Sequence, residues 1–182
     1  MAKSKSAYSV PTKKQKSETY IFVVWVDNEA GVLARVVGLF SGRGYNIESL
    51  AVAEVDAVRN ISRITIVTTG TPQVIDQIRL QLTKLVPVHK VAEFKRDDKN
   101  VIFKEMALFK IVGKRNKIEK CLNACKNYSP VILDETKSSA VIQITALRRE
   151  IDIMNKKLKP LGLISTSRTG AVAMTRGAKI FN

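Results

Sequence analysis

The chain has 182 residues, of which 45% are hydrophobic, and a formal net charge of +15. This length can bury one large or two small hydrophobic cores, and two small ones fit the pattern below better. No apolar stretch reaches the roughly 18 residues that a membrane-spanning helix needs, and the first nineteen residues lack the apolar segment of a secretory signal, so we expect a soluble protein with no membrane partner.

The N-terminal residues 1–19 are rich in Lys and Ser and contain five Lys, one acid and no Arg. This composition predicts a disordered basic tail and is not that of a convincing organelle transit peptide. Organellar targeting by this tail stays open, and a bacterial cytoplasmic location is the simpler expectation.

The first predicted strand is Tyr20–Val26 (YIFVVWV), an unbroken apolar run of strand length. Asp27 and Asn28 end this strand, and Asn28 is expected to cap the next helix by accepting a backbone N–H. The helix turns an apolar stripe toward a sheet, formed by Leu33, Val36, Val37 and Phe40 with Val32 and Leu39 beside them. Gly42 and Gly44 end the helix, and Asn46 and Ile47 open the next strand.

The loop before this helix is a candidate ligand site. A buried strand, a tight polar loop with Gly31 and a helix N-terminus together present unpaired N–H groups and a positive partial charge. Such a place suits a small carboxylate. The alternative is that Gly31 only permits close packing of the loop on the helix, and the spacing of the residues leaves both interpretations open.

The rest of the first half completes a recognisable order of elements. Ile47–Val55 and Ile61–Thr68 read as a strand hairpin, a helix follows Pro72, and Val88–Phe94 is a last strand. The order βαββαβ predicts a ferredoxin-like domain at residues 20–94, with two helices on one face of a four-stranded antiparallel sheet and the other face exposed.

A similar plan recurs after the polar stretch Lys95–Asn100, which lies in a linker placed at residues 95–102. The expected elements are strands at Met106–Val112, Val131–Asp134, Ala140–Thr145 and Leu163–Ser167 and helices at Lys114–Asn127 and Ala146–Lys159. The chain is therefore expected to have an α+β fold of two tandem ferredoxin-like domains, the second at residues 103–182.

The positive charge is unevenly distributed. Residues 20–94 carry seven charges of each sign, whereas residues 95–182 carry nineteen basic and eight acidic side chains. A solvated lysine face is the simplest explanation, and a docking surface for an acidic partner protein is the second. No nucleic-acid partner is expected, because the basic residues are not interleaved with aromatic residues that would stack on bases.

No catalytic or metal site is evident from the sequence. Cys121 and Cys125 lie four apart on a predicted helix without further ligands, so buried free thiols in a reducing compartment are expected. His89 lies in a strand, where a structural or surface role is expected. Nucleotide loops, zinc spacings and nucleophile elbows are missing, so we expect no catalytic site and no cofactor in this chain.

The stretch Asp27–Leu50 (DNEAGVLARVVGLFSGRGYNIESL) closely resembles the signature of the small, regulatory subunits of acetolactate synthase. The resemblance continues through SRITIVTTG (Ser62–Gly70), LVPVHKV (Leu85–Val91) and SRTGAVAMTRG (Ser167–Gly177) and covers about 160 residues. Trp25 departs from it, standing where a smaller aliphatic residue is usual.

The resemblance implies that residues 20–94 are an ACT domain, a βαββαβ module that binds amino acids. It also implies a homodimer whose ACT domains pair side by side and bind a branched-chain amino acid. The partner would be the large catalytic subunit, which holds thiamine diphosphate, a divalent metal (Mg) and FAD and makes acetolactate in branched-chain amino acid biosynthesis. The other interpretation is a free-standing ACT-type sensor acting on another enzyme or on transcription.

Carried over residue by residue, the resemblance places the effector site on a loop and on the strand edge that faces it. The loop contributes Asn28, Gly31, Val32 and Leu33, and the strand edge contributes Asn46 and Ile47. N–H groups near Gly31 are expected to hold the effector's carboxylate, and amide and carbonyl oxygens its ammonium group. Val32, Leu33 and Ile47 are expected to enclose the effector's side chain.

Overall fold

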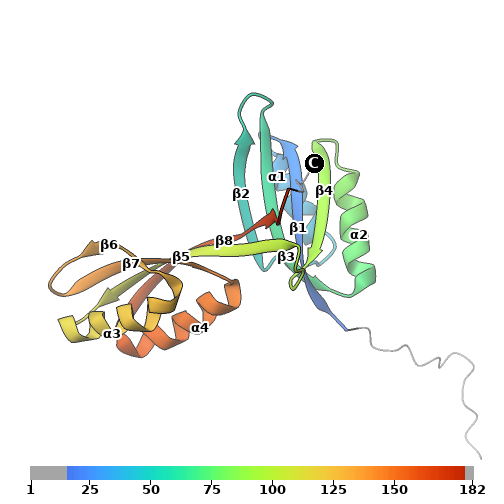
Figure 1. The fold of residues 1–182 in the computed structure, drawn as a ribbon. Coiled ribbons are helices and arrows are strands. Elements are labelled where there is room, and N and C mark those ends of the chain that lie inside the picture. The colour runs from blue at the N-terminus through green and yellow to red at the C-terminus, as the bar shows by residue number, and fades with distance from the viewer. Residues whose placement is uncertain (1–15, 179–182) are drawn as a thin grey trace, which may run out of the picture.

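A computed structural model describes residues 16–178, which form two domains linked by a long two-stranded ribbon (Figure 1). The first domain consists of β1 (Glu18–Asp27), α1 (Val32–Ser41), β2 (Ser49–Asp56), β3 (Ile61–Gly70), α2 (Pro72–Thr83) and β4 (Val88–Lys95). The second consists of β5 (Val101–Val112), α3 (Arg115–Cys125), β6 (Val131–Glu135), β7 (Ser139–Ala146), α4 (Arg148–Leu158) and β8 (Leu163–Thr175). None of the described helices is long and apolar enough to cross a membrane.

Both domains have the predicted ferredoxin-like topology. Their sheets are antiparallel, with strand orders β2-β3-β1-β4 and β6-β7-β5-β8. In each sheet the strand that begins the βαββαβ unit is central, because the first crossover helix carries the chain to the far side of the third strand. The prediction of an α+β fold with two tandem ferredoxin-like domains is confirmed.

Several predicted boundaries were wrong by a few residues. β1 begins at Glu18, so the tail predicted at 1–19 was two residues too long, and residues 1–15 lie outside the described part. β4 runs to Lys95 and β5 begins at Val101, so the linker between strands is residues 96–100 and not 95–102. Strand pairing extends these elements beyond the point where the apolar pattern stops.

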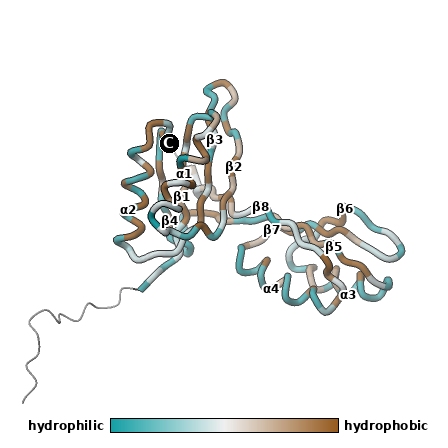
Figure 2. The backbone as a smooth tube through the Cα atoms, turned by 180° about the vertical axis from the view of Figure 1, so that it is seen from behind, coloured by the Kyte–Doolittle hydropathy of each residue, from teal (hydrophilic) through white to brown (hydrophobic). Residues whose placement is uncertain are grey.

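The core of the first domain lies between its sheet and its two helices. The buried side chains of Phe22 and Val24 on β1 and Ile64 and Ile66 on β3 pack against the helices through Val36, Phe40, Ile75, Ile78 and Leu82. The tube in Figure 2 shows α2 alternating between hydrophobic and hydrophilic residues, as an amphipathic helix should. Its first turn has Pro72 after an N-cap, Thr71, whose side chain accepts a hydrogen bond from the Val74 N–H.

The second core repeats this arrangement with α3 and α4. Cys121 and Cys125 are fully buried in it and are free thiols, as predicted. Burial raises the pKa of the Cys125 thiol to about 11, with a further contribution from Cys121, which makes it a poor nucleophile at neutral pH.

The second face of the first sheet is largely covered, so the prediction that this face is exposed was wrong. β8, expected at Leu163–Ser167, continues to Thr175 and pairs with the start of β5 beyond the second sheet. This ribbon, Val101–Glu105 with Ala171–Thr175, lies across the first sheet (Figure 1). The ribbon and the first sheet together form a third apolar cluster, with Trp25 packed against it. The cluster consists of Ile21, Val23, Val67, Val101, Ala171 and Ala173. The Arg63 guanidinium also lies over the ring of Trp25, 5.4 Å from the ring centre. The large Trp25 side chain therefore covers part of the contact between the first sheet and the ribbon.

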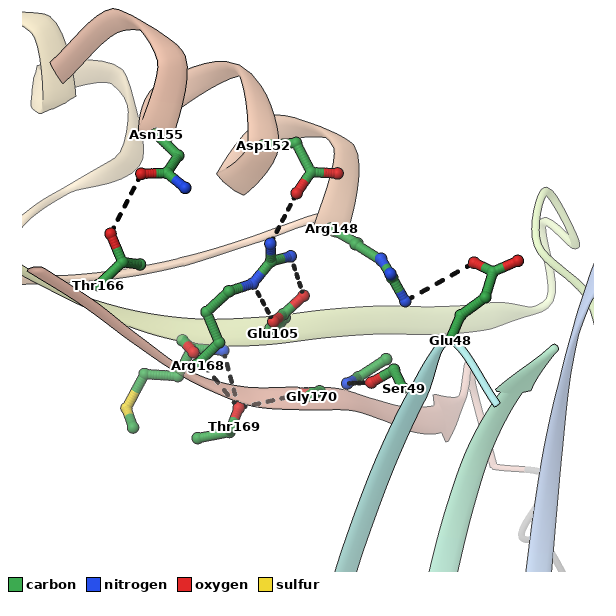
Figure 3. A network of polar contacts seen from close by, with 12 residues as sticks. Glu48, Ser49, Glu105, Arg148, Asp152, Asn155, Thr166, Arg168, Thr169 and Gly170 are labelled. Atoms are coloured by element: carbon green, nitrogen blue, oxygen red, sulfur yellow. Dashed lines mark hydrogen bonds and ion pairs between the residues drawn. The ribbon is translucent and has the colours of Figure 1, made fainter. Parts of the chain in front are cut away.

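An ion pair with a buried carboxylate lies at the end of the ribbon, where β5 and β8 enter the second sheet. Arg168 on β8 donates two hydrogen bonds to Glu105 on β5, at 2.6 and 2.8 Å, and a third to Asp152 on α4, at 2.7 Å (Figure 3). Glu105 is 3% exposed, and its hydrogen bonds raise the pKa of Arg168. The two parallel bonds hold the point where the ribbon leaves the second sheet.

Candidate functional site

The loop between β1 and α1 opens the helix with a glycine and without a capping side chain. Gly31 is the N-cap residue, with φ 86° and ψ −11°, and no side chain accepts a hydrogen bond from the first turn. This left-handed conformation suits glycine and strains other residues. The prediction that Asn28 caps α1 was therefore wrong.

Asn28 instead fixes the loop to the hairpin of β2 and β3. Its backbone N–H donates to the Asn60 carbonyl at 2.7 Å, and its side-chain Oδ1 accepts from the Ser62 hydroxyl at 2.9 Å. Its carbonyl accepts from the Asn60 side chain at 3.3 Å. These three bonds hold the loop beside the first residues of β3.

The N-terminus of α1 presents free donors. Within residues 16–178, the N–H groups of Gly31, Leu33 and Ala34 have no hydrogen-bond acceptor, whereas the N–H of Val32 reaches the Glu29 carbonyl at 3.3 Å. A Cβ built on Gly31 would meet no atom within 4 Å, so this backbone is open to an incoming group. Free N–H groups and the helix dipole together suit a carboxylate.

The two apolar candidates beside this loop point in different directions. Leu33 is 41% exposed, but Val32 is 3% exposed and belongs to the core with Val36 and Phe40. The structure thus contradicts the expected role of the Val32 side chain, because a residue at the first helical position turned toward the sheet cannot also face a ligand.

Asn46 and Ile47 lie in the connection between α1 and β2, not in a strand as predicted, since β2 begins at Ser49. The Asn46 side chain is exposed, while its carbonyl accepts a 2.7 Å hydrogen bond from the Thr68 hydroxyl on β3. Ile47 is half-buried against the core. The connection therefore lies along the last residues of β3.

The two predicted parts of the site are not brought together within one chain. Asn28 is hydrogen-bonded to Ser62 and Asn46 to Thr68, and these two anchors lie six positions apart on β3, or about 20 Å at about 3.3 Å per residue. β2 is an edge strand that pairs, among the described residues, with β3 alone. One pocket can combine both parts only if a second copy supplies one of them.

The two residues that position the loop and the connection were not predicted from the sequence. Ser62 is 5% exposed and Thr68 is 1% exposed, and each uses its hydroxyl to hold one predicted ligand residue. The available signal was a hydroxyl side chain at each end of the apolar face that Ile64 and Ile66 form on β3, where a buried polar group needs a partner. No described cluster of His, Cys, Asp and Glu side chains could hold a metal ion.

The fold and the glycine-opened helix define the class of protein. Residues 22–90 match a family model described as the AHAS small subunit-like ACT domain. Residues 104–177 match a second model, described as the small subunit of acetolactate synthase. The first domain is thus an ACT domain. The second ferredoxin-like domain matches the family model of the acetolactate synthase small subunit.

The similarity to known proteins extends over nearly the whole chain. The acetolactate synthase small subunit of Mycobacterium bovis is 33% identical over 89% of this chain and 95% of its own length. That of Buchnera aphidicola is 38% identical over 85% of this chain and 96% of its own length. The crystal structure of the acetolactate synthase small subunit from Thermotoga maritima has a TM-score of 0.79 and 32% identity, and covers 88% of this chain and 99% of its own.

This chain belongs to the acetolactate synthase small-subunit family. The family is that of the regulatory subunit, which is not itself catalytic. The resemblance noted in the sequence is confirmed.

Proposed function

We propose that this chain binds the large catalytic subunit of acetolactate synthase, activates it, and makes it sensitive to feedback inhibition by valine or another branched-chain amino acid. One observation carries the proposal beyond family membership. The free N–H groups of Gly31, Leu33 and Ala34 and the exposed Asn46 connection occupy opposite ends of the same domain, as a site shared between two copies requires.

A two-fold pairing of β2 edges would complete this site. Antiparallel pairing sets the end of β2, at Asp56, beside the start of the partner's β2, at Ser49. The hairpin at Asn60 holds the Asn28 loop, so the loop lies at the Asp56 end. The connection through Asn46 and Ile47 leads directly into Ser49. The pairing therefore brings the loop of one copy next to the connection of the other, twice per dimer.

The chemistry of the two parts is complementary to a free amino acid. The N–H groups of Gly31, Leu33 and Ala34 would hold the carboxylate. The ammonium group needs acceptors, which the exposed Asn46 side chain and neighbouring carbonyls supply. Oδ1 of Asn28 already accepts from Ser62 and keeps a second lone pair for the ligand. Leu33 and Ile47 offer the apolar surface that selects a branched side chain.

Inhibition follows if the effector binds one arrangement of the dimer better than another, because a ligand shifts an equilibrium only by its difference in affinity. The large subunit would supply the chemistry, including thiamine diphosphate, Mg and FAD, and this chain would supply the switch. The buried free thiols of Cys121 and Cys125 fit a reducing cytoplasm. The bacterial and archaeal relatives give no support to organellar targeting.

The test is an acetolactate assay of the purified large subunit, with and without the full chain, across a valine titration. We expect the chain to raise the basal rate and to confer inhibition. Gly31→Asp should abolish inhibition, since a left-handed aspartate strains the loop and its carboxylate repels the effector's own. It should leave activation in place.

Gly38→Asp is the matched control. Gly38 is exposed on the same helix, and a Cβ built on it would meet no atom within 4 Å. The same substitution there should leave inhibition intact. Unchanged inhibition in Gly31→Asp would remove the loop from the site, and the lack of any effect of the chain on the large subunit would refute the regulatory function.

A further inference from the structure

A cleft of about 660 Å³ lies between the two domains, away from the Gly31 loop. Its walls come from the start of β1, the end of β4 and Glu48 in the first domain, and from the N-terminal end of α4 in the second. Its floor includes Ile21, Val67, Phe103 and Ala171. A volume of this size is typical of sites for small molecules.

The cleft is lined by an excess of basic side chains. Among the described residues, six are basic and three are acidic, the basic ones being Lys16, Lys95, Arg96, Lys104, Arg148 and Arg149. Lys95 is committed to Glu18, at 2.8 Å. Within residues 16–178, Arg96, Lys104 and Arg149 have no carboxylate partner, so three cations around one hollow are free to meet an anion.

Arg148 provides an independent sign of a missing acceptor. Its Nη1 atom is buried and has no hydrogen-bond partner among the described residues. The nearest carboxylate oxygen, Oε2 of Glu48, is 3.8 Å away, too far for a hydrogen bond (Figure 3). A buried guanidinium N–H without an acceptor is destabilising. The side chain is 31% exposed, so the guanidinium has room to turn toward an anion in the cleft.

We propose that this interdomain cleft binds a small organic anion with at least two negative charges, either a phosphate ester or a dicarboxylate. The guanidinium groups of Arg96, Arg148 and Arg149 match the oxygen pairs of both kinds of group. The apolar floor, with the ring of Phe103, accepts the body of the molecule. Because the walls belong to both domains, the bound anion ties the first domain to the second.

This site is separate from the proposed amino-acid site and does not depend on it. The cleft contains none of the residues from Asn28 to Leu33. Its test is direct binding to the full chain, without the large subunit and without valine. Failure of one proposal is therefore distinguishable from failure of the other.

The probes are phenyl phosphate, phthalate and benzoate, titrated calorimetrically into the full chain at physiological ionic strength. All three carry a benzene ring, and they differ in the number and kind of charges. We expect saturable binding of at least one dianion and about tenfold weaker binding of benzoate, since each lost charge-assisted bond removes at least that factor. The stronger dianion tells whether the natural ligand is a phosphate or a carboxylate. The bound dianion should also raise the thermal midpoint.

The variants separate the cleft from the general positive charge of the chain. Arg96→Gln with Arg149→Gln should weaken dianion binding by about tenfold or more. The control is Lys120→Gln with Lys157→Gln, which removes the same charge from exposed positions of α3 and α4 outside the cleft and should change binding less than about twofold. Equal losses in both variants, or no saturable binding of either dianion, would overturn the proposal.

Discussion

Asn28 and Asn46 lie at opposite ends of strand β3, each held by a buried hydroxyl. Ser62 donates to the side chain of Asn28 at 2.9 Å, and Thr68 donates to the carbonyl of Asn46 at 2.7 Å. The resemblance assigns both residues to one effector site, so the spacing makes a second copy part of the proposed pocket. If the proposed pocket forms, these two contacts contribute to regulation as well as to folding, and substitutions can separate the two roles.

The β2 edge should control dimerisation and, through it, effector binding. Val52 is 43% exposed near the middle of β2, where a two-fold axis would bring it close to its own copy. Val52→Lys should weaken the dimer several-fold, because like charges facing each other across strands repel. Sedimentation velocity over a range of concentrations measures this change.

Val86→Lys is the control for that experiment, since Val86 is 95% exposed between α2 and β4, on the opposite edge. It should leave the dimer unchanged. If Val52→Lys dimerises like the unmodified chain, the copies pair through another surface and the shared pocket cannot form.

The hydroxyl of Ser62 should be needed for inhibition more than for folding. Ser62→Ala removes the hydrogen bond that holds the Asn28 side chain, so the loop loses its position while the strand stays paired. We expect the valine concentration for half-inhibition to rise about five- to tenfold, with a loss of about 1 kcal/mol in the free energy of unfolding. Ser62→Thr keeps the hydroxyl and should restore inhibition. A normal valine response in Ser62→Ala would mean that Asn28 does not position the effector.

The ion pair between Arg168 and Glu105 should be a large single contribution to stability. Arg168→Leu leaves the carboxylate of Glu105, which is 3% exposed, without its charged partner, at a cost of about 3 kcal/mol. Urea unfolding measures the loss. The double variant Arg168→Leu with Glu105→Leu should recover most of it, because no buried charge remains.

Arg115→Leu is a matched control for Arg168→Leu. Arg115 pairs with Glu119 and Glu135 on the surface and is 65% exposed, so its loss should change the free energy of unfolding by less than about 1 kcal/mol. Similar losses at Arg115 and Arg168 would contradict the special role of the buried pair.

The Cys125 thiol should make stability fall in alkaline solution. Burial raises its pKa from 9.0 to about 11, so the folded state keeps the proton while the unfolded state releases it. The stabilisation is complete below pH 9 and is lost as the pH rises toward 11, by about 3 kcal/mol in total. Cys125→Ala lacks this titration. In urea unfolding with a reductant between pH 8 and 11, its stability should fall less steeply than that of the unmodified chain, and parallel curves would contradict the assignment.

Much of the fold could be predicted because its signals are local. The apolar run of β1, the helical stripe of Val36 and Phe40, and Pro72 after Thr71 each act within a few residues. Alternation and turn residues then set the hairpin of β2 and β3. The candidate loop was also predicted from local signals, because Gly31 directly precedes a helix. Its φ of 86° is a backbone conformation that glycine adopts readily.

The errors came where distant segments meet. Asn28 was expected to cap α1, but Ser62 and Asn60, more than thirty residues away, hold it elsewhere. Val32 was expected to contact the ligand, but its side chain is buried in the core against the sheet. The extension of β8 to Thr175 depends on pairing with Val101, and Gly170 fits there because a Cβ would lie 2.8 Å from Ser49 Oγ. None of these distant partners can be inferred from the local pattern of apolar residues.

The amino-acid sequence by itself determined two βαββαβ units, a glycine-opened helix suited to a carboxylate, and the family to which the chain belongs, because period, turn chemistry and motif are written along the chain. Only the tertiary structure decided that the ribbon of β5 and β8 closes the second face of the first sheet, and that Asn28 and Asn46 lie at opposite ends of β3. The physical reason is that burial and strand register depend on partners far along the chain, and the free energy of those contacts is settled only when the whole chain packs.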